Sequence, residues 1–139
     1  MLLLGECYSV FNATTRGITV TVMPVYIDER SDPEASRYFW AYRVIIENKS
    51  GEEVQLVSRY WHITDSNGFV EEVEGEGVVG EQPRIEDGGE YSYTSGCPLE
   101  TPSGIMLGKY TMKNASRGYF EVEIPAFPLD LPDLNPILN

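Results

Sequence analysis

Apolar and polar residues alternate along short stretches of this chain, and clusters of turn-forming residues separate the stretches. Alternation with a period of two is the pattern of β-strands, and no window shows a sustained helical repeat. The pattern predicts seven strands: Ile18–Ile27, Tyr38–Asn48, Val54–Thr64, Phe69–Glu76, Gly89–Ser95, Ile105–Lys113 and Tyr119–Ile124. Seven short strands at this spacing favour an all-β fold, an antiparallel sandwich of two sheets.

Two of these strands carry further information. Tyr38–Asn48 alternates large apolar side chains with a mixed face, so we expect it to be a central strand of the core. Pro24 interrupts the first strand. Because proline has no N–H to donate, this strand should lie at a sheet edge or switch sheets at that point.

The third strand and the turn after it make specific predictions. The parity of the apolar residues changes between Leu56 and Trp61, which predicts a β-bulge near Ser58–Arg59 and a buried Trp61. The dipeptide Asn67-Gly68 predicts a hairpin with a type I′ turn, in which both residues have positive φ.

The connections should gather at the two ends of an antiparallel sandwich. If each connection reverses direction, segments 49–52, 77–88 and 114–118 share one end, and segments 28–37, 65–68 and 96–104 share the other. The tail Pro125–Asn139 is rich in proline, and we expect an extended strap there.

Composition narrows the class of protein. With 139 residues the chain is long enough for one domain whose core needs neither metal nor disulfide. Ten Lys and Arg against 22 Asp and Glu give a net charge of −12, which argues against a nucleic-acid partner. The apolar run 2–4 is too short for an export signal, and Cys7 and Cys97 are too few for a disulfide framework. We therefore expect a cytoplasmic protein with reduced thiols and no membrane insertion.

The segment Val70–Pro83, which reads VEEVEGEGVVGEQP, resembles the signature segment of the ApaG family. Four further segments fit the same family: Tyr93–Gly96, Thr101–Gly104, Gly108–Met112 and Ile124–Phe127. The resemblance covers about Thr15 to Pro128 of a single domain spanning 1–139, with 1–14 as an N-terminal arm and 129–139 as a Pro-rich tail. It implies a sandwich of the fibronectin type III or immunoglobulin-like kind.

The resemblance also implies a function without catalysis. Bacterial members of the family have no established catalytic activity and are linked to cobalt resistance and magnesium efflux. Where the domain occurs in eukaryotic proteins, a protein-binding role is inferred. The chain itself carries no G-x-S-x-G motif and no local cysteine signature of a nucleophile. We expect a protein-interaction module, monomeric or weakly dimeric, without a cofactor and not an enzyme.

Gly75, Gly77 and Gly80 match the spacing G-x-G-x-x-G of dinucleotide-binding loops. In such sites a helix follows the glycines and directs its N-terminus at the phosphates, but no helical pattern follows here. The glycines could instead serve turns that need positive φ. A small-ligand module that binds nucleotide or pyrophosphate through this loop is the alternative function.

Other residues that could carry chemistry favour structural roles. Glu72, Glu74 and Glu76 share one strand face and offer the oxygen ligands that Mg²⁺ prefers, but a row of carboxylates more often guards a strand edge. We expect no specific metal site. His62 is the only histidine and should be a surface strand residue, while Cys97 has no cation beside it in sequence to lower its pKa.

Val78 and Val79 lie between glycines in an otherwise acidic loop. If they are exposed they form a candidate partner-binding patch bordered by Glu81 and Gln82, since binding surfaces are often loops held by a rigid scaffold. The equal alternative is that one of the valines closes the end of the sandwich.

Overall fold

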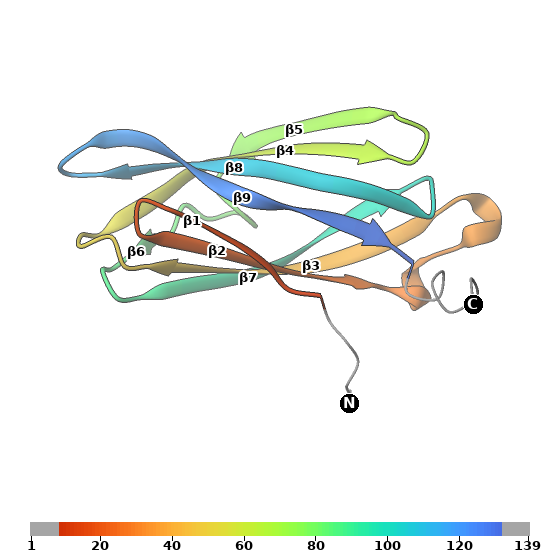
Figure 1. Cartoon of the computed structure of the whole chain (residues 1–139), viewed down its shortest axis with the longest axis horizontal. Helices are drawn as coiled ribbons and strands as arrows, with labels where there is room; N and C mark the ends of the chain where they lie inside the picture. Colours follow the sequence, from red (N-terminus) through yellow and green to blue (C-terminus); the bar gives the residue numbers. More distant parts are fainter. Residues whose placement is uncertain (1–8, 132–139) are drawn as a thin grey trace.

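The structure, a computed structural model, describes residues 9–131. These residues form nine β-strands (Figure 1): β1 Phe11–Thr15, β2 Ile18–Tyr26, β3 Tyr38–Asn48, β4 Val54–Asp65, β5 Val70–Glu76, β6 Arg84–Ile85, β7 Glu90–Leu99, β8 Ser103–Asn114 and β9 Gly118–Asp130. Two short 3₁₀ turns, Asp28–Arg30 and Pro33–Ala35, lie between β2 and β3. Over residues 9–131 there is no helix long and apolar enough to cross a membrane.

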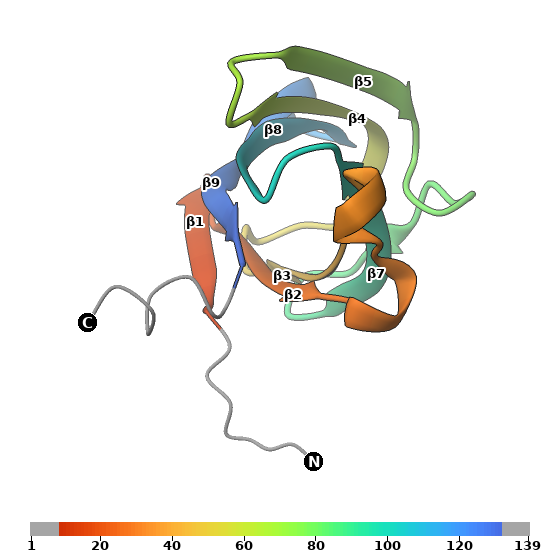
Figure 2. The same ribbon diagram turned by 90° about the vertical axis from the view of Figure 1, so that its right-hand side faces the viewer.

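The strands form two antiparallel sheets that face each other across a shared core (Figure 2). One sheet has the strand order β1-β2-β3-β7, and the other has the order β5-β4-β8-β9. The short β6 pairs with the start of β4, on the same edge of β4 as β5. The predicted two-sheet antiparallel sandwich is confirmed.

All seven predicted strands are present, but several bounds differ. β7 continues to Leu99 instead of ending at Ser95, and β9 continues to Asp130. Pro125–Asp130 therefore belong to a sheet and not to a strap, while residues 132–139 of the expected strap lie outside the described residues. β1, within and just beyond the expected N-terminal arm, and β6, within the expected loop 77–88, were not predicted.

Two bulges explain how these strands stay in register. The β4–β8 register passes from Leu56 to Ser58, so Val57 is the extra residue, one position before the predicted bulge. In the β8–β9 pair, Pro125 and Ala126 together oppose Leu107. A bulge accommodates a proline that cannot donate to the ladder, which is why Pro125 does not end β9 as the sequence suggested.

Pro24 lies on β2 just beyond the point where the neighbouring strand β1 stops pairing with β2. β2 is an inner strand, but its pairing with β1 ends at Val22, so no strand flanks Pro24 on that side. The predicted edge or sheet-switching strand is therefore wrong, because β2 is an inner strand that pairs with β3 on both sides of Pro24. β3 is an inner strand as predicted, with Trp40, Tyr42 and Val44 buried.

The type I′ turn predicted at Asn67-Gly68 is wrong. Gly68 has φ +84°, but Asn67 has no positive φ. The Asp65 carboxylate accepts the backbone N–H groups of Asn67 at 2.9 Å and Phe69 at 3.0 Å, and the Gly68 N–H donates to the Asp65 carbonyl. These bonds hold the central turn residues at negative φ and leave only the glycine left-handed.

The core fills the space between the sheets with the inward residues of both. Trp61 is 3% exposed, as predicted, and its ring centroid lies 5.2 Å from that of Tyr42 and 6.0 Å from that of Phe127. These residues come from β4, β3 and β9, so Trp61 joins the two sheets. Gly108 faces the same ring, and a Cβ there would lie 2.1 Å from the Tyr60 carbonyl oxygen, so only glycine fits.

The connections gather at two ends as expected (Figure 1). At one end the Gly51 N–H donates to Asp87, and the Ser116 hydroxyl donates to Glu52. At the other end the Ser66 N–H donates to the Thr101 hydroxyl. The loop after β5 therefore lies at the end opposite the β4–β5 turn.

The open side of the sandwich as candidate functional site

The two long sides of the sandwich differ. On one side β1 meets β9: the Glu123 N–H donates to the Thr15 hydroxyl at 3.2 Å, and the Phe11 and Phe127 rings are 6.2 Å apart. On the other side the sheets end at β5 and β7, and neither edge pairs with a further strand from residues 9–131 (Figure 2). We call this second side, between β5 and β7, the open side.

The segment after β5 forms a tight hairpin at the open side. The Val78 N–H donates to the Glu81 carbonyl at 2.8 Å, and the Glu81 N–H returns to the Val78 carbonyl at 2.9 Å. The two residues between them, Val79 and Gly80, have φ of +42° and +85°. Two successive positive φ values are the mark of a type I′ turn, a conformation that β-branched residues rarely adopt.

The two valines of the predicted patch have different environments. Val78 is 1% exposed and packs in the core, whereas Val79 is 56% exposed at the tip of the hairpin. Glu81 and Gln82 are exposed beside it. Val78 therefore closes the core and does not belong to the predicted patch, whose exposed residues are Val79, Glu81 and Gln82. Partner binding through them stays a prediction.

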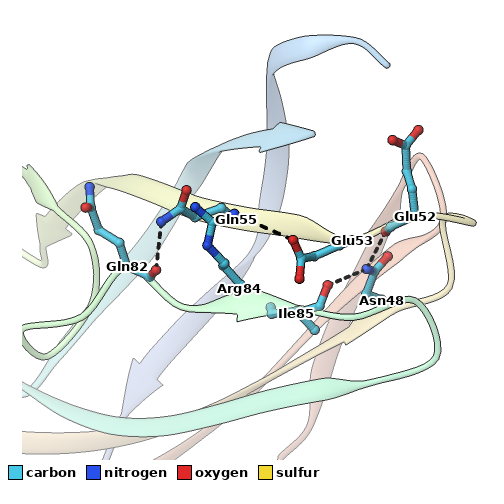
Figure 3. Close-up of polar contacts among 7 residues, drawn as sticks. All are labelled: Asn48, Glu52, Glu53, Gln55, Gln82, Arg84 and Ile85. Atoms are coloured by element: carbon cyan, nitrogen blue, oxygen red, sulfur yellow. Dashed lines mark hydrogen bonds and ion pairs between the residues drawn. The ribbon is translucent and has the colours of Figure 1, made fainter. Parts of the chain in front are cut away.

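The hairpin is anchored firmly to β4. Gln82 Nε2 donates to the Val57 carbonyl at 2.9 Å. Figure 3 shows the second bond, in which Gln55 Nε2 donates to the Gln82 carbonyl at 3.1 Å. The Leu56 N–H donates to the Pro83 carbonyl at 2.9 Å. The loop is thus a fixed part of the scaffold.

The next residues, in β6, are held by a buried amide. Asn48 is fully buried, and its Nδ2 donates to the carbonyls of Ile85 at 2.9 Å and Glu52 at 2.8 Å (Figure 3). The Arg84 guanidinium lies 3.5 Å from the Glu53 carboxylate. Because both side chains are exposed, this ion pair contributes little to the free energy of folding. Asn48 is the residue that ties the end of the loop to β3.

Arg59 is the central residue that the sequence did not single out. Its Nη1 donates to the carbonyls of Gly77 at 2.8 Å and Glu76 at 3.1 Å. It borders a cavity of about 280 Å³ between the sheets. The other lining residues come from β3, β4, β5, β7 and the hairpin: Tyr42, Trp61, Glu76, Val78, Val79, Gly80, Tyr93 and Ser95. A charged residue in a strand normally indicates a solvent-exposed face. The position of Arg59 in the sequence therefore did not predict that its side chain binds the loop after β5.

Each glycine of the G-x-G-x-x-G spacing has a backbone role. A Cβ at Gly75 would lie 2.9 Å from the Arg59 guanidinium, and a Cβ at Gly77 would lie 2.1 Å from the Glu81 carbonyl oxygen. Gly80 supplies the second positive φ of the hairpin. The N–H groups of Gly77, Val78 and Glu81 all donate to backbone carbonyls, whereas phosphate loops keep such groups free. Ligand binding through this loop stays a prediction.

The buried hydroxyl and thiol groups at the open side are held in their neutral forms. Burial raises the pKa of Tyr42, Tyr93 and Tyr110 above the usual value, and the Tyr93 and Tyr110 hydroxyls hydrogen-bond to each other. Burial, with a smaller effect of the Glu71 charge, raises the pKa of the Cys97 thiol to about 12. A protonated thiol is a poor nucleophile.

The remaining predicted residues lie apart from this cavity. His62 is half-buried on β4, opposite Glu72 on one side and Leu107 on the other, and faces away from the core that holds Cys97. Glu72 accepts the Tyr60 hydroxyl at 2.6 Å. Among residues 9–131 no three His, Cys, Asp or Glu side chains come close enough to hold a metal ion.

A second apolar surface lies on the outer face of the β5-β4-β8-β9 sheet. Val70, Ile105 and Leu107 are 48%, 51% and 41% exposed. Val70 and Ile105 are both cross-strand neighbours of Thr64, so they lie in one row. The sequence analysis missed this surface because Ile105 and Leu107 belong to a strand whose other face supplies the core.

Three comparisons place this chain among known proteins. A family model described as the ApaG domain matches residues 28–114. A protein named Protein ApaG from Allorhizobium ampelinum is 58% identical over 129 residues, which cover 93% of this chain and 99% of that protein. The Protein ApaG of Brucella suis biovar 1 is 57% identical over the same length and the same shares.

Solved structures agree in fold. A crystal structure described as an ApaA protein from Bordetella pertussis is 42% identical to this chain, with a TM-score of 0.79. The match covers 91% of this chain and 96% of the chain in that crystal structure.

Proposed function

Because this chain belongs to the ApaG family, we propose that it is a non-catalytic, protein-binding member of that family and that the open side is its binding surface. The observation that carries the proposal is Val79. This β-branched residue is exposed at φ +42° on a hairpin that hydrogen bonds fix in place. Unfavourable backbone conformations of this kind, kept on a rigid scaffold, are found at functional sites.

The chemistry of the open side supports binding over catalysis. The thiol and the three buried phenols are neutral at physiological pH, and the Arg59 guanidinium already binds two carbonyls. An acid–base or nucleophilic mechanism needs a group that changes protonation near the working pH. We propose that the protein has no catalytic role.

We further propose that the partner acts in divalent-cation homeostasis. This part rests on the association of ApaG proteins with cobalt resistance and magnesium efflux. The carboxylates of β5 project from an exposed edge, and Glu72 is already engaged by Tyr60, so direct metal binding has no support in their arrangement. The link to cations would then run through the partner. Loss of the cation phenotype in a variant that no longer binds the partner would support it.

The test compares two exposed apolar residues. Val79→Glu and Leu107→Glu each place a carboxylate on the surface, one at the open side and one on the outer sheet face. Both variants should keep the native melting temperature because neither residue is buried. We expect affinity capture from the expressing cell to lose the partner with Val79→Glu and to keep it with Leu107→Glu. Capture unchanged by Val79→Glu would contradict the proposed surface.

The alternative function, a small-ligand module, has its own measurement. Melting is compared with and without ATP, a diadenosine polyphosphate or pyrophosphate. A ligand at 100 times its Kd stabilises the folded state by about 2.7 kcal/mol. A shift of that size, absent in an Arg59→Gln variant, would favour the ligand module.

A further inference from the structure

The hydrogen-bond phase of β7 determines which of its backbone groups face the open side. The Asn48 N–H donates to the Gly89 carbonyl, and the β3–β7 register continues from there without a shift. In an antiparallel pair every second residue turns its N–H and C=O toward its neighbour. Tyr93, Ser95 and Cys97 therefore bond to β3, and the alternate residues turn outward.

The outward groups of β7 have no backbone partner. They are the N–H groups of Glu90, Ser92, Thr94 and Gly96, together with the carbonyls of those residues and of Pro98. Within residues 9–131 none of these outward groups donates or accepts a backbone hydrogen bond. The Ser92 and Thr94 side chains are exposed beside them. After Glu90, β7 is thus a regular edge whose next three outward donors have no backbone partner among residues 9–131.

This edge lacks the usual protection. Natural sheets block their edges with charged side chains, bulges, prolines or very short strands. Residues 91–99 carry no charged side chain, the register has no bulge, and the strand spans ten residues. Only Pro98, near its end, interrupts the row of donors.

The surroundings of the edge are acidic. Glu90 begins the strand and Glu100 follows its end. Glu81 accepts a hydrogen bond from the Tyr91 hydroxyl at 3.4 Å. The Glu71 carboxylate is close enough to Cys97 for its negative charge to raise the pKa of the thiol. Three cations lie nearby. Arg43 donates to the Ser92 hydroxyl on the outer face, and Arg59 lines the open-side cavity together with Glu76. Arg37 lines a second cavity, at the Glu100 end of β7, together with Glu71. Carboxylates therefore outnumber cations around β7.

We propose that β7 binds an extended, basic segment of a partner protein, which adds to the four-stranded sheet as a further strand. The backbone of the segment would bond to Ser92, Thr94 and Gly96, and its lysines or arginines would face the surrounding carboxylates. Main-chain bonds give such strand addition its affinity, and side-chain contacts give its specificity. The inference rests on the proposed function and names the class of partner at the same open side.

A second copy of this chain fits the edge less well. Each copy carries a net charge of −12. Self-pairing centred on Ser95 would set Glu90 of one copy opposite Glu100 of the other, and like charges directly opposite each other destabilise a strand pair. A basic segment reverses the sign of these contacts.

The probe is a blocked ten-residue peptide of alternating lysine and valine, with alternating glutamate and valine as the control. Binding is followed by calorimetry, and amide exchange is followed by nuclear magnetic resonance. The lysine peptide should slow exchange at Ser92, Thr94 and Gly96 at least tenfold, and its affinity should fall as salt rises. The glutamate peptide should not bind. Absence of protection at millimolar lysine peptide, or equal binding of both peptides, would overturn the inference.

Variants of Thr94 separate backbone pairing from general charge attraction. Thr94→Pro removes one outward donor and no bond to β3, and Pro98 already occupies an outward position of the same phase. It should weaken lysine-peptide binding at least tenfold while the melting temperature stays close to native. Thr94→Lys keeps the donor but repels the peptide, so it should also weaken binding even if the proline variant does not fold.

The matched control is Glu74→Pro, which removes an outward donor from β5 instead of β7. It should leave peptide binding unchanged, and equal loss in both proline variants would overturn the inference. The proposed function is tested separately, by capture of the natural partner. If Val79→Glu loses that partner and Thr94→Pro retains it, the function stands and the β7 inference fails. If no partner is captured at all, the proposed function fails.

Discussion

Strands β5 and β7 border the same opening and are both unpaired on their outer side within residues 9–131, yet their sequences protect them very differently. β5 is seven residues long, and four of them are glutamates. In β7 the nine residues after Glu90 carry no charge. The bonds Gly77 N–H to Val57 O and Asp65 N–H to Phe69 O show that Glu72, Glu74 and Glu76 turn their backbone groups outward.

The difference shows how one fold can block one edge and leave the other available. On β5 the outward backbone groups of Glu72, Glu74 and Glu76 belong to residues with exposed carboxylates, which disfavour an approaching strand, and only Val70 at the start of the strand is uncharged. On β7 the outward groups lie between serine, threonine and glycine. A partner strand is thereby directed to one edge.

The largest effect concerns the core that supports both edges. Trp61 lies on β4, beside β5, and packs against Tyr42 of β3, beside β7. Trp61→Ala should cost about 3–5 kcal/mol of unfolding free energy, because it removes a buried aromatic side chain from between the sheets. Urea unfolding measures the cost. An unchanged midpoint would mean that the two edges do not share one core.

Alkaline pH should weaken the sheet that contains β7. Burial raises the pKa of the Cys97 thiol from 9.0 to about 12. Above pH 9 the unfolded chain releases this proton and the folded chain keeps it, so stability present below pH 9 is lost as the pH rises toward 12. The raised pKa values of Tyr93 and Tyr110 add to the loss above pH 10. We expect a loss of roughly 2 kcal/mol or more by pH 11.

Urea unfolding between pH 8 and pH 11 measures this dependence. In a Cys97→Ala variant the part of the loss that begins near pH 9 should disappear, and the part that begins near pH 10 should remain. A stability that stays constant across this window would show that the pKa values of the thiol and the phenols are not raised by burial.

Removing the charges of β5 should make the two edges alike. In a triple variant with Glu72→Gln, Glu74→Gln and Glu76→Gln, the outward groups keep their geometry and lose their repulsion. Each like-charge opposition costs about 0.2–1 kcal/mol, so self-association should strengthen about tenfold.

Sedimentation equilibrium measures the association, and the control separates edge chemistry from net charge. Glu29→Gln, Glu34→Gln and Glu86→Gln remove three exposed charges outside both edges. This control should not associate more strongly than the native protein. Equal association of both triple variants would mean that β5 is not an edge guarded by charge.

The parts of the fold that the sequence predicted are those where local pattern and tertiary packing agree. β3 alternates cleanly because one of its faces is buried, and Trp61 followed the same rule after the bulge. β1 was missed because its five residues, FNATT, have little apolar character and gain their place by pairing with β2. Pro125 suggested an end of strand that the bulge opposite Leu107 prevents.

The sequence predicted which loop forms the candidate site, but not the side-chain contacts and backbone conformation of that loop. The sequence indicated the loop 75–82, and the structure brings it to the open side. The sequence did not indicate Arg59, because hydrogen bonds from a guanidinium to backbone carbonyls require no particular residue type or spacing in the loop. Nor did it reveal that a valine occupies a turn position where asparagine is favoured.

That valine gives the smallest effect and separates stability from binding. Val79→Asn should raise the unfolding free energy by about 1 kcal/mol, because asparagine tolerates the left-handed conformation that a β-branched residue resists. Arg16 occupies the same position of the β1–β2 turn with φ +52° but is not β-branched, so Arg16→Asn should gain less. Denaturant midpoints measure both variants. If Val79 is retained for its partner, Val79→Asn should also weaken partner capture while it stabilises the fold, and a variant that gains stability and keeps full binding would show that the strain at the hairpin serves no contact.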